Sequence, residues 1–415
     1  MSRINLILRY LSCQDGSFRV PSSADIEYGK GQRVKIAVIG AGLMGRAAVY
    51  DLAHNSRVAQ VGVYDIDRKL AQTVARKYGG RKTISGRLDA GDTAGAERLF
   101  RSYDAVISAV TYRYNPGLAK AAIRAGAHFF DLGGNNAVVA QEFRLDSAAR
   151  KANVVVIPDC GLAPGMVSII AAGDLARFDR PESLHIRVGG LPQKPHPPLN
   201  YQMLFSAEGL INEYCEPVVS IRNGRKVVLP PMTEVERLSF RGIGDLEAFA
   251  TSGGTSTLPQ TYGRVLKNLD YKTIRYPRHC DKFKTMLDIG LADRHMIAAD
   301  GAKVSPRSVL KAVLDKNLSF SEPDLTLVRI VTEGRTAGKK KRLISEIIDR
   351  QDKKTGLTSM MRCTSFPVAI IAVMAAGGEI SARGVVPQEK AVDPMLFERE
   401  LAERKIKITR RWERG

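Results

Sequence analysis

The stretch from Val34 to Gly45, VKIAVIGAGLMG, decides the fold. Its first six residues predict a buried strand, and the three glycines that follow form a G-x-G-x-x-G motif between that strand and a helix. The first glycine permits a tight turn, the second lets a pyrophosphate approach the backbone, and the third lets the helix pack on the strand. The unpaired N–H groups at the start of the helix also favour a diphosphate. We expect a dinucleotide to contact Gly40, Gly42, Leu43, Met44 and Gly45. The alternative is a structural glycine turn in a domain that binds no nucleotide.

The end of the next predicted strand carries a candidate ribose ligand. Asp65 lies 20 residues after Gly45, where a carboxylate accepts hydrogen bonds from the adenosine ribose. Asp67 competes for this role but is more typical of a helix cap. Arg68 could pair with a 2′-phosphate, whereas Asp65 would repel one. We therefore predict NAD rather than NADP as the cofactor.

Strand-like and helix-like runs alternate as far as Ile157, which predicts a parallel, doubly wound α/β sheet of the Rossmann type. After Asp159 this alternation stops. Asn223-Gly224 separates two β-rich runs, the strongest short hairpin signal, and residues 325–331 and 343–348 predict another antiparallel pair. We expect a second domain with a mixed or antiparallel sheet. An apolar run at 366–377, with Pro367 at its start, predicts a buried helix, and the charged tail from Pro387 is interpreted as helical.

Two strand ends of the first domain offer further cofactor contacts. Ala109, Val110 and Thr111 follow the fourth strand at the point where open α/β sheets bind ligands. Gly133, after the fifth strand, suggests backbone that lies close to a ligand. An ordinary strand end and a simple turn are the alternatives.

Composition excludes several classes of protein. The 415 residues include 63 Lys and Arg against 43 Asp and Glu, a net charge of +20, but the basic residues are spread along the chain and match no nucleic-acid-binding module. We expect no nucleic-acid partner and no membrane span. Five widely separated cysteines form no disulfide framework and no metal site, which fits a cytoplasmic protein without a bound metal.

The second domain carries polar clusters without a recognised catalytic pattern. Gly254 and Thr255 belong to a Gly/Ser/Thr loop that could present several donors to a carboxylate, or could be a flexible connector. Arg275 could bind a carboxylate with both arms of its guanidinium, or lie on a solvated strand face. The absence of a nucleophile motif argues against hydrolase chemistry. We interpret the ligand as a small-molecule amino acid.

Several segments together resemble a known family. VIGAGLMGRAA, DLGG, VIPDCGLAPGM, LEAFATSGGTSTLP, YKTIRYPRH and TSFPVAIIAVMAAGG are similar to segments of the saccharopine dehydrogenase-like enzymes, and most of all to the lysine 6-dehydrogenase branch. The resemblance runs from about residue 34 to residue 408. Ser365 replaces the glycine of the T-G-F-P segment seen in many saccharopine dehydrogenases.

This resemblance implies an architecture: a discontinuous Rossmann domain at 33–160 and 360–415, an inserted α/β domain at 161–359 for substrate binding and oligomerisation, and an N-terminal extension at 1–32. It also implies NAD-dependent oxidative deamination of the ε-amino group of L-lysine to the 6-semialdehyde and ammonia. The alternative is saccharopine dehydrogenase or another secondary-amine oxidoreductase. A distant alternative is a basic nucleic-acid-binding protein with a vestigial Rossmann domain.

Hydride loss from an amine requires that the nitrogen first lose a proton, so the site needs a general base. The candidates are Asp131, Asp159, Lys272, His196 and His279, and the residues themselves do not choose among them. We expect a homo-oligomer, a dimer or larger.

Overall fold

The first sheet forms because buried strands alternate with helices in the N-terminal third of the chain. The structure is a computed structural model that describes residues 33–319 and 322–415, so the expected extension at 1–32 lies outside the described residues. Seven parallel strands run in the order β17-β6-β5-β4-β1-β2-β3. They are β1 (Val34–Ile39), β2 (Val58–Asp65), β3 (Thr83–Arg87), β4 (Ala105–Ser108), β5 (His128–Asp131), β6 (Val155–Ile157) and β17 (Gly384–Val385).

Two helices of this part begin at aspartates that cap them. The Asp67 and Asp92 side chains accept backbone N–H groups at the first turns of their helices, so Asp67 is a helix cap, as expected. Between β5 and β6 the chain forms two short helices separated by Arg144 and Leu145. The helices are α2 (Leu43–His54), α3 (Arg68–Val74), α4 (Thr93–Phe100), α5 (Asn115–Ala125), α6 (Asn136–Phe143), α7 (Asp146–Lys151) and α8 (Met166–Leu175).

The second sheet is mixed, with the path β10-β11-β12-β7-β15-β16-β18 and β8 and β9 attached at β12. β7 and β12 pair in parallel, and the other pairs are antiparallel. The fold class predicted from the sequence is confirmed. The strands are β7 (Arg180–Pro192), β8 (Val218–Arg222), β9 (Arg225–Leu229), β10 (Glu236–Phe240), β11 (Gly244–Ala250), β12 (Asn268–Arg275), β15 (Asp324–Thr336), β16 (Lys339–Arg350) and β18 (Thr409–Arg414).

The remaining elements lie around this sheet or beyond it. Helices α9 and α11 and part of α12 enclose a separate apolar cluster against β11. The small hairpin β13–β14 forms a sheet of its own. These elements are α9 (Ala207–Cys215), α10 (Leu258–Tyr262), α11 (His279–Asp288), β13 (Ile297–Ala299), β14 (Ala302–Val304), α12 (Pro306–Asn317), α14 (Gln388–Ala391) and α15 (Pro394–Glu403).

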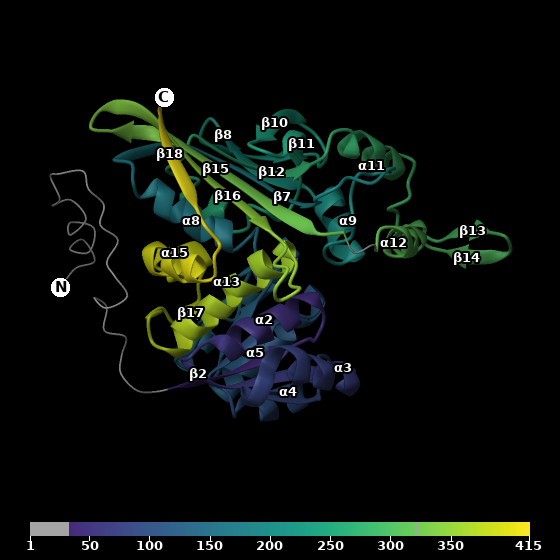
Figure 1. Cartoon of the computed structure of the whole chain (residues 1–415), viewed down its shortest axis with the longest axis vertical. Coiled ribbons are helices and arrows are strands. Elements are labelled where there is room, and N and C mark those ends of the chain that lie inside the picture. The colour runs from purple at the N-terminus through teal and green to yellow at the C-terminus, as the bar shows by residue number, and fades with distance from the viewer. Residues whose placement is uncertain (1–32, 320–321) are drawn as a thin grey trace. The chain divides into compact units, whose positions relative to one another are not determined.

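The helix α13 (Ser359–Ala376) packs against α2 and β4 of the first sheet and against β15 of the second (Figure 1). It begins seven residues before the expected start, and Pro367 lies in its interior, which corrects the sequence interpretation. The cap is Thr358, whose hydroxyl accepts the Met361 N–H. By length and composition α13 could cross a membrane, but 89% of it is buried inside the protein, as in a core helix.

The C-terminal segment is divided between the two sheets. β17 extends the first sheet next to β6, whereas β18 pairs with β16 of the second. The tail after Pro387 is therefore helical only as far as Glu403 and ends in a strand. The expected assignment of all of 360–415 to the Rossmann domain does not hold for β18.

Candidate active site

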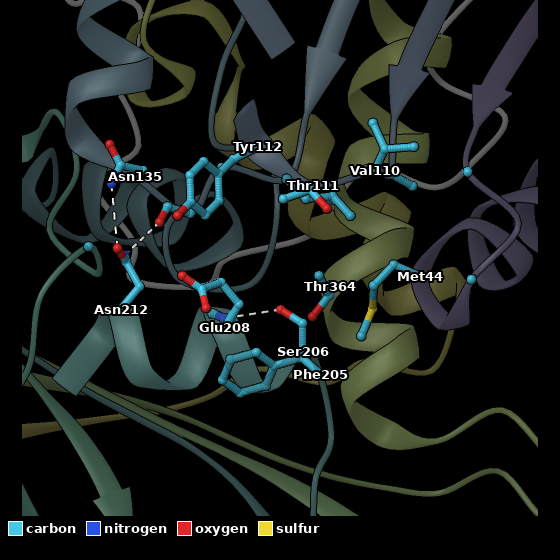
Figure 2. Close-up of a pocket in the computed structure, with 18 of the residues that line it drawn as sticks. Met44, Val110, Thr111, Tyr112, Asn135, Phe205, Ser206, Glu208, Asn212 and Thr364 are labelled. Carbon is cyan, nitrogen blue, oxygen red and sulfur yellow. Dashed lines mark hydrogen bonds between the residues drawn. The ribbon is translucent and has the colours of Figure 1, made fainter. Parts of the chain in front are cut away.

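One cavity of about 830 Å³ runs from the glycine loop after β1 to the face of β12 in the second sheet. Figure 2 shows part of its lining, with Met44, Val110 and Thr111 on one side and Glu208 and Asn212 of α9 on another. The cavity therefore joins the predicted dinucleotide site to the second domain.

The glycine loop has the shape that a dinucleotide requires. Gly40 has φ of +103°, and a Cβ there would lie 2.6 Å from the Ala109 carbonyl oxygen. A Cβ at Gly45 would overlap the Gly40 carbonyl oxygen, so this glycine serves helix packing and does not line the cavity. Gly42 lines the cavity, and a Cβ added there would meet nothing within 4 Å, which leaves its backbone open to a ligand. Leu43 and Met44 also line the cavity.

Asp65 lies at the end of β2 and lines the same cavity. Its carboxylate accepts the Ala41 N–H at 2.7 Å and the Asp67 N–H at 2.9 Å, so the side chain is held beside the glycine loop. Asp89, after β3, lines this end too, and Arg68 is exposed outside the lining. The end of the cavity where the sequence predicts the adenosine ribose is therefore lined by carboxylates.

The strand ends named above also meet here. Ala109, Val110 and Thr111 follow β4 and line the cavity, as does Gly133 after β5. Gly133 has φ of +72°, and a Cβ there would overlap the Asp159 carboxylate. Asp131 is fully buried behind the cavity wall, and its Oδ1 accepts the Gly133 N–H at 2.6 Å and the Asp159 N–H at 3.2 Å.

Asp159 is the one general-base candidate whose side chain both lines the cavity and is almost completely buried, among the described residues. The Ser256 hydroxyl donates a hydrogen bond to its Oδ2. Burial, and then the negative charge of Asp131, raise the pKa of Asp159 to about 7. A carboxylate with that pKa can take up and release a proton near neutrality.

Arg275 lines the opposite end of the cavity and is only 3% exposed. Its Nε donates to the Tyr214 hydroxyl at 2.8 Å, its Nη1 donates to the Ile274 carbonyl at 2.9 Å, and the guanidinium lies over the Tyr201 ring. Burial opposes its charge, but nearby Tyr214 and Tyr201 and the carboxylate of Glu213 raise the pKa of Arg275. Within the described part of the chain no carboxylate lies within 4.0 Å of it.

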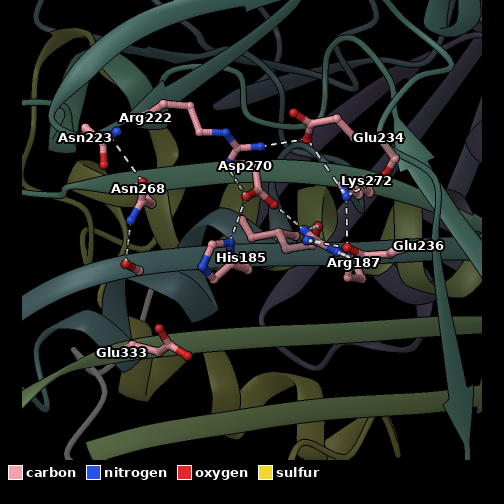
Figure 3. Close-up of polar contacts among 12 residues, drawn as sticks. His185, Arg187, Arg222, Asn223, Glu234, Glu236, Asn268, Asp270, Lys272 and Glu333 are labelled. Carbon is pink, nitrogen blue, oxygen red and sulfur yellow. Dashed lines mark hydrogen bonds and ion pairs between the residues drawn. The ribbon is translucent and has the colours of Figure 1, made fainter. Parts of the chain in front are cut away.

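Lys272 lies on the other face of β12, outside the cavity. Figure 3 shows its ammonium group among the side chains of Glu234, Glu236 and Arg187. It donates to the Glu234 carbonyl at 2.7 Å and to the Glu236 carboxylate at 2.9 Å. Because successive side chains of a strand point to opposite faces, Lys272 and Arg275 cannot both face the cavity. The prediction that Lys272 is catalytic is not supported by its position.

The histidine candidates also lie away from the cavity lining. His279 is fully buried, and burial together with the charge of Arg275 lowers its pKa to about 3. Its Nδ1 donates to the Leu199 carbonyl, which leaves Nε2 to accept the Tyr214 hydroxyl. This neutral histidine supports Tyr214, and through it Arg275. His196 lies beside Glu322, with 3.2 Å between His196 Nε2 and the carboxylate.

The Gly/Ser/Thr loop reaches the cavity through residues other than those expected. Ser252 and Gly253 line it, whereas Gly254 packs on the Tyr271 ring and the Thr255 hydroxyl donates to the Val219 carbonyl at 3.4 Å. Gly254 and Thr255 therefore shape the wall and do not face the ligand space.

The sequence interpretation missed the contribution of α9. Glu213 lines the cavity and accepts hydrogen bonds from the Thr251 and Thr273 hydroxyls, and Asn212 donates to the Gly134 carbonyl at 2.9 Å across the cavity. The helix precedes the hairpin in the chain and carries no motif. Only the period of two along β12 could have indicated that Tyr271 and Thr273 share the face of Arg275.

A glycine loop that opens onto a ligand-sized cavity at the carboxyl ends of parallel strands defines a Rossmann-type nucleotide-binding protein. Comparison with known families is more specific. Residues 36–157 match the saccharopine dehydrogenase NADP binding domain, and residues 161–406 match the saccharopine dehydrogenase C-terminal domain. The chain therefore belongs to the saccharopine dehydrogenase family of oxidoreductases, and the family resemblance seen in the sequence is confirmed.

Similar proteins include two curated yeast enzymes described as saccharopine dehydrogenase [NADP(+), L-glutamate-forming]. The Saccharomyces cerevisiae enzyme is 26% identical over 198 residues, 46% of this chain and 41% of the relative. The Schizosaccharomyces pombe enzyme is 25% identical over 249 residues, 57% of this chain and 55% of the relative. The chain thus spans about half the length of these relatives. The structure of apo saccharopine dehydrogenase (L-Glu forming) from Saccharomyces cerevisiae matches 92% of this chain and all of its own, with a TM-score of 0.74 and 19% identity, which shows a shared fold.

Proposed function

We propose that this protein is a pyridine-nucleotide-dependent dehydrogenase that oxidises the C–N bond at the side-chain nitrogen of lysine or of an N-substituted lysine. Arg275 carries the proposal. Arg275 is a buried guanidinium that forms no ion pair within 4.0 Å in the described structure, with the Glu213 carboxylate farther away, and such a group is costly unless a ligand supplies a closer anion. The α-carboxylate of an amino acid is such an anion, and the planar fork of arginine suits it.

Saccharopine, or a related secondary amine, is the first candidate substrate. The family matches and both curated relatives support it. Oxidation of its secondary amine, followed by addition of water to the C=N bond, would release glutamate and an aldehyde. A bound oxidised nicotinamide would supply the hydride acceptor.

L-lysine is the second candidate, favoured by the charges of the cavity. Saccharopine carries three carboxylates and lysine carries one. Among the described residues the lining holds two cationic side chains, the buried Arg275 and the exposed Lys311. The lining also holds the carboxylates of Glu208, which is paired with Arg307 at 2.9 Å, and of Glu213, which suits an ammonium group of a diamine. Lysine would give the 6-semialdehyde and ammonia.

Asp159 is our choice for the group that accepts the proton of the substrate nitrogen. It lines the cavity, and its raised pKa of about 7 makes the ionised form available at neutral pH. Below that pH the carboxyl is protonated and cannot act as a base. The rate of amine oxidation should therefore rise as pH increases through about 7.

NAD is our proposal for the cofactor, although the curated relatives are described as NADP enzymes. Two carboxylates, Asp65 and Asp89, line the end of the cavity where a 2′-phosphate would lie, and both would repel it. Asp65→Ser should lower the ratio of kcat/KM for NAD to that for NADP by roughly tenfold or more. An unchanged ratio would remove Asp65 from the ribose site.

A panel of amines tests the proposed reaction. The purified protein is supplied with saccharopine, L-lysine or cadaverine, each with NAD or NADP, and formation of the reduced nicotinamide is followed by absorbance. Release of glutamate from saccharopine supports the first candidate, and release of ammonia from lysine supports the second. Equal rates with lysine and cadaverine, which lacks the α-carboxylate, would contradict the proposed role of Arg275.

A further inference from the structure

Three carboxyl groups lie together behind the wall of the cavity. Asp131 of β5 and Glu142 of α6 are fully buried, and Asp159 is 2% exposed. None of the three forms an ion pair with a lysine, arginine or histidine of the described chain. Isolated buried carboxylates are strongly unfavourable, so the cluster must hold fewer charges than carboxyl groups.

The carboxyl oxygens of Asp131, Asp159 and Glu142 differ in whether a donor reaches them. Asp131 Oδ1 accepts two backbone N–H groups, and Asp159 Oδ2 accepts the Ser256 hydroxyl. Asp131 Oδ2 and both oxygens of Glu142 receive no N–H or O–H group from the described residues. The side chains of Asp131 and Glu142 are within hydrogen-bonding reach of each other. One proton between them satisfies both facing oxygens, and no other donor is present among the described groups.

The position of Glu142 is unusual for a glutamate. α6 is a helix of eight residues whose buried side chains are Val139 and Glu142, three residues apart and thus on one face. An apolar residue at 142 would satisfy this helical pattern. The glutamate instead directs a carboxyl group at Asp131.

We propose that Glu142 is a positioning residue that holds a proton behind the cavity and donates it to Asp131, so that the pair keeps one negative charge next to Asp159. This inference rests on the proposed function in so far as Asp159 is the base. Glu142 itself does not line the cavity and touches no substrate.

The proton on Glu142 affects Asp159 through the charge that it leaves on Asp131. The groups that act on it are Asp131 of β5, Glu389 of α14 and the hydroxyl of Ser256. Burial, followed by the charge of Asp131, raises the pKa of Glu142 to about 11, so Glu142 is neutral at physiological pH. Asp131, with two backbone donors, keeps the charge that helps to raise the pKa of Asp159.

The first test does not depend on activity. Infrared difference spectra of the full chain against Glu142→Gln, recorded at about pH 9 where Asp159 is ionised and Glu142 keeps its proton, should show the carbonyl stretch of a protonated carboxylic acid in the wild type only. The exposed Glu403 has no bonded partner among the described residues, and Glu403→Gln is the matched control that should leave this band intact. A wild type without the band would overturn the inference.

The pH dependence of stability is a second measurement that needs no substrate. Glu142 is ionised in the unfolded chain above its ordinary pKa of 4.5 and protonated in the folded protein up to about 11. The folded state therefore binds one more proton in this window, and stability falls as pH rises. Relative to Glu142→Gln, the unfolding constant of the wild type should increase about tenfold per pH unit between about pH 6 and pH 9. Parallel curves would overturn the inference.

A third measurement separates positioning from packing. Glu142→Leu removes the donor, so Asp131 should take up the proton itself and lose its charge. The acidic limb of the pH–rate profile should then move to lower pH, by about one unit. Glu142→Gln supplies an N–H donor and should restore the wild-type position of that limb. An equal displacement in both variants would contradict the role of the proton. If no amine is oxidised, the proposed function fails while the spectra and stability curves still decide the state of Glu142.

Discussion

A buried arginine lies on each face of β12, but the two arginines differ in their bonding partners. On one face Arg187, from the neighbouring β7, lies between Asp270 and Glu236, and Asp270 also accepts hydrogen bonds from His185 and Arg222 (Figure 3). On the other face Arg275 is equally buried and bonds only to a tyrosine hydroxyl and a carbonyl among the described groups. On the first face the charged groups form ion pairs within the protein, whereas on the second face the Arg275 guanidinium forms no ion pair, the Glu213 carboxylate lies farther away, and a ligand can approach.

This difference separates structural ionic groups from functional ones. Burial would raise the pKa of Asp270, but its hydrogen bond with His185 and the charge of Arg187 hold that pKa well below its ordinary value. All its partners come from the fold. Burial and a shifted pKa therefore do not by themselves identify a site, whereas a buried cation that lines a cavity and forms no ion pair is a candidate ligand group.

The largest expected effect is a loss of stability when the ion pairs around Arg187 are removed. Arg187→Met leaves Asp270 buried with fewer cations, which should cost about 3–5 kcal/mol of unfolding free energy. Arg275→Met is the matched control, because it removes a buried charge with no carboxylate partner in the described structure, and it should cost much less. Urea unfolding of both variants measures the difference. Equal losses would show that the two faces are alike.

The next largest effect is weaker substrate binding when Arg275, on the cavity face of β12, is substituted. Arg275→Lys keeps the charge but loses the fork, which should raise KM by about ten- to a hundredfold, equivalent to roughly 1.5–3 kcal/mol, and change kcat less. Steady-state kinetics with lysine or saccharopine measures this. Oxidation of cadaverine, which has no α-carboxylate, should not respond, and a similar loss with cadaverine would contradict the assignment.

Lys272→Met sharpens the comparison along one strand. Lys272 lies only three residues before Arg275 but on the opposite face of β12, where Glu236 also pairs with Arg187. We therefore expect destabilisation of about 1–3 kcal/mol from the lost hydrogen bonds to Glu236 and to the Glu234 carbonyl, and no change in kcat beyond a few fold. Thermal unfolding and kinetics on one preparation give both values. A fall in kcat by several orders of magnitude with intact stability would restore Lys272 as a catalytic group.

The smallest effect concerns the base itself. The Ser256 hydroxyl lowers the pKa of Asp159, opposing burial and the charge of Asp131. Ser256→Ala removes that hydrogen bond, so the pKa should rise above about 7 and the acidic limb of the pH–rate profile should move up, by about one unit or less. A limb that stays in place would show that Asp159 does not set it.

Much of the first domain could be predicted from the sequence because local signals specify it. The glycine motif, the cap at Asp67 and the carboxylate at Asp65 each depend on residues close in the chain, and the structure brings them to one cavity. The apolar run at 366–377 predicted a core helix, but the first two turns of α13, where Met360, Met361 and Cys363 alternate with polar residues, were missed.

The substrate end could be predicted only in part, because it depends on pairing between distant segments. Arg275 was identified from its chemistry, but which face of β12 it occupies is set by the register with β7. Glu213 and Glu142 come from separate parts of the chain and carry no motif, and Ser256 was missed although it lies in the Gly/Ser/Thr loop that the sequence analysis identified. Lys272 and His279 were chosen for residue type alone, which does not distinguish a cavity from a closed network.

The pairing of β17 with β6 has a consequence for biosynthesis. The seventh strand of the first sheet, Gly384–Val385, is synthesised after every other strand of that sheet and after β7 to β16 of the second. β18 joins the second sheet later still. Contacts between segments so far apart in the sequence slow folding and leave strand edges exposed meanwhile. Neither sheet can therefore be complete until residues 384–414 have been synthesised, and deleting this segment should lower the yield of soluble protein before it affects any cofactor contact.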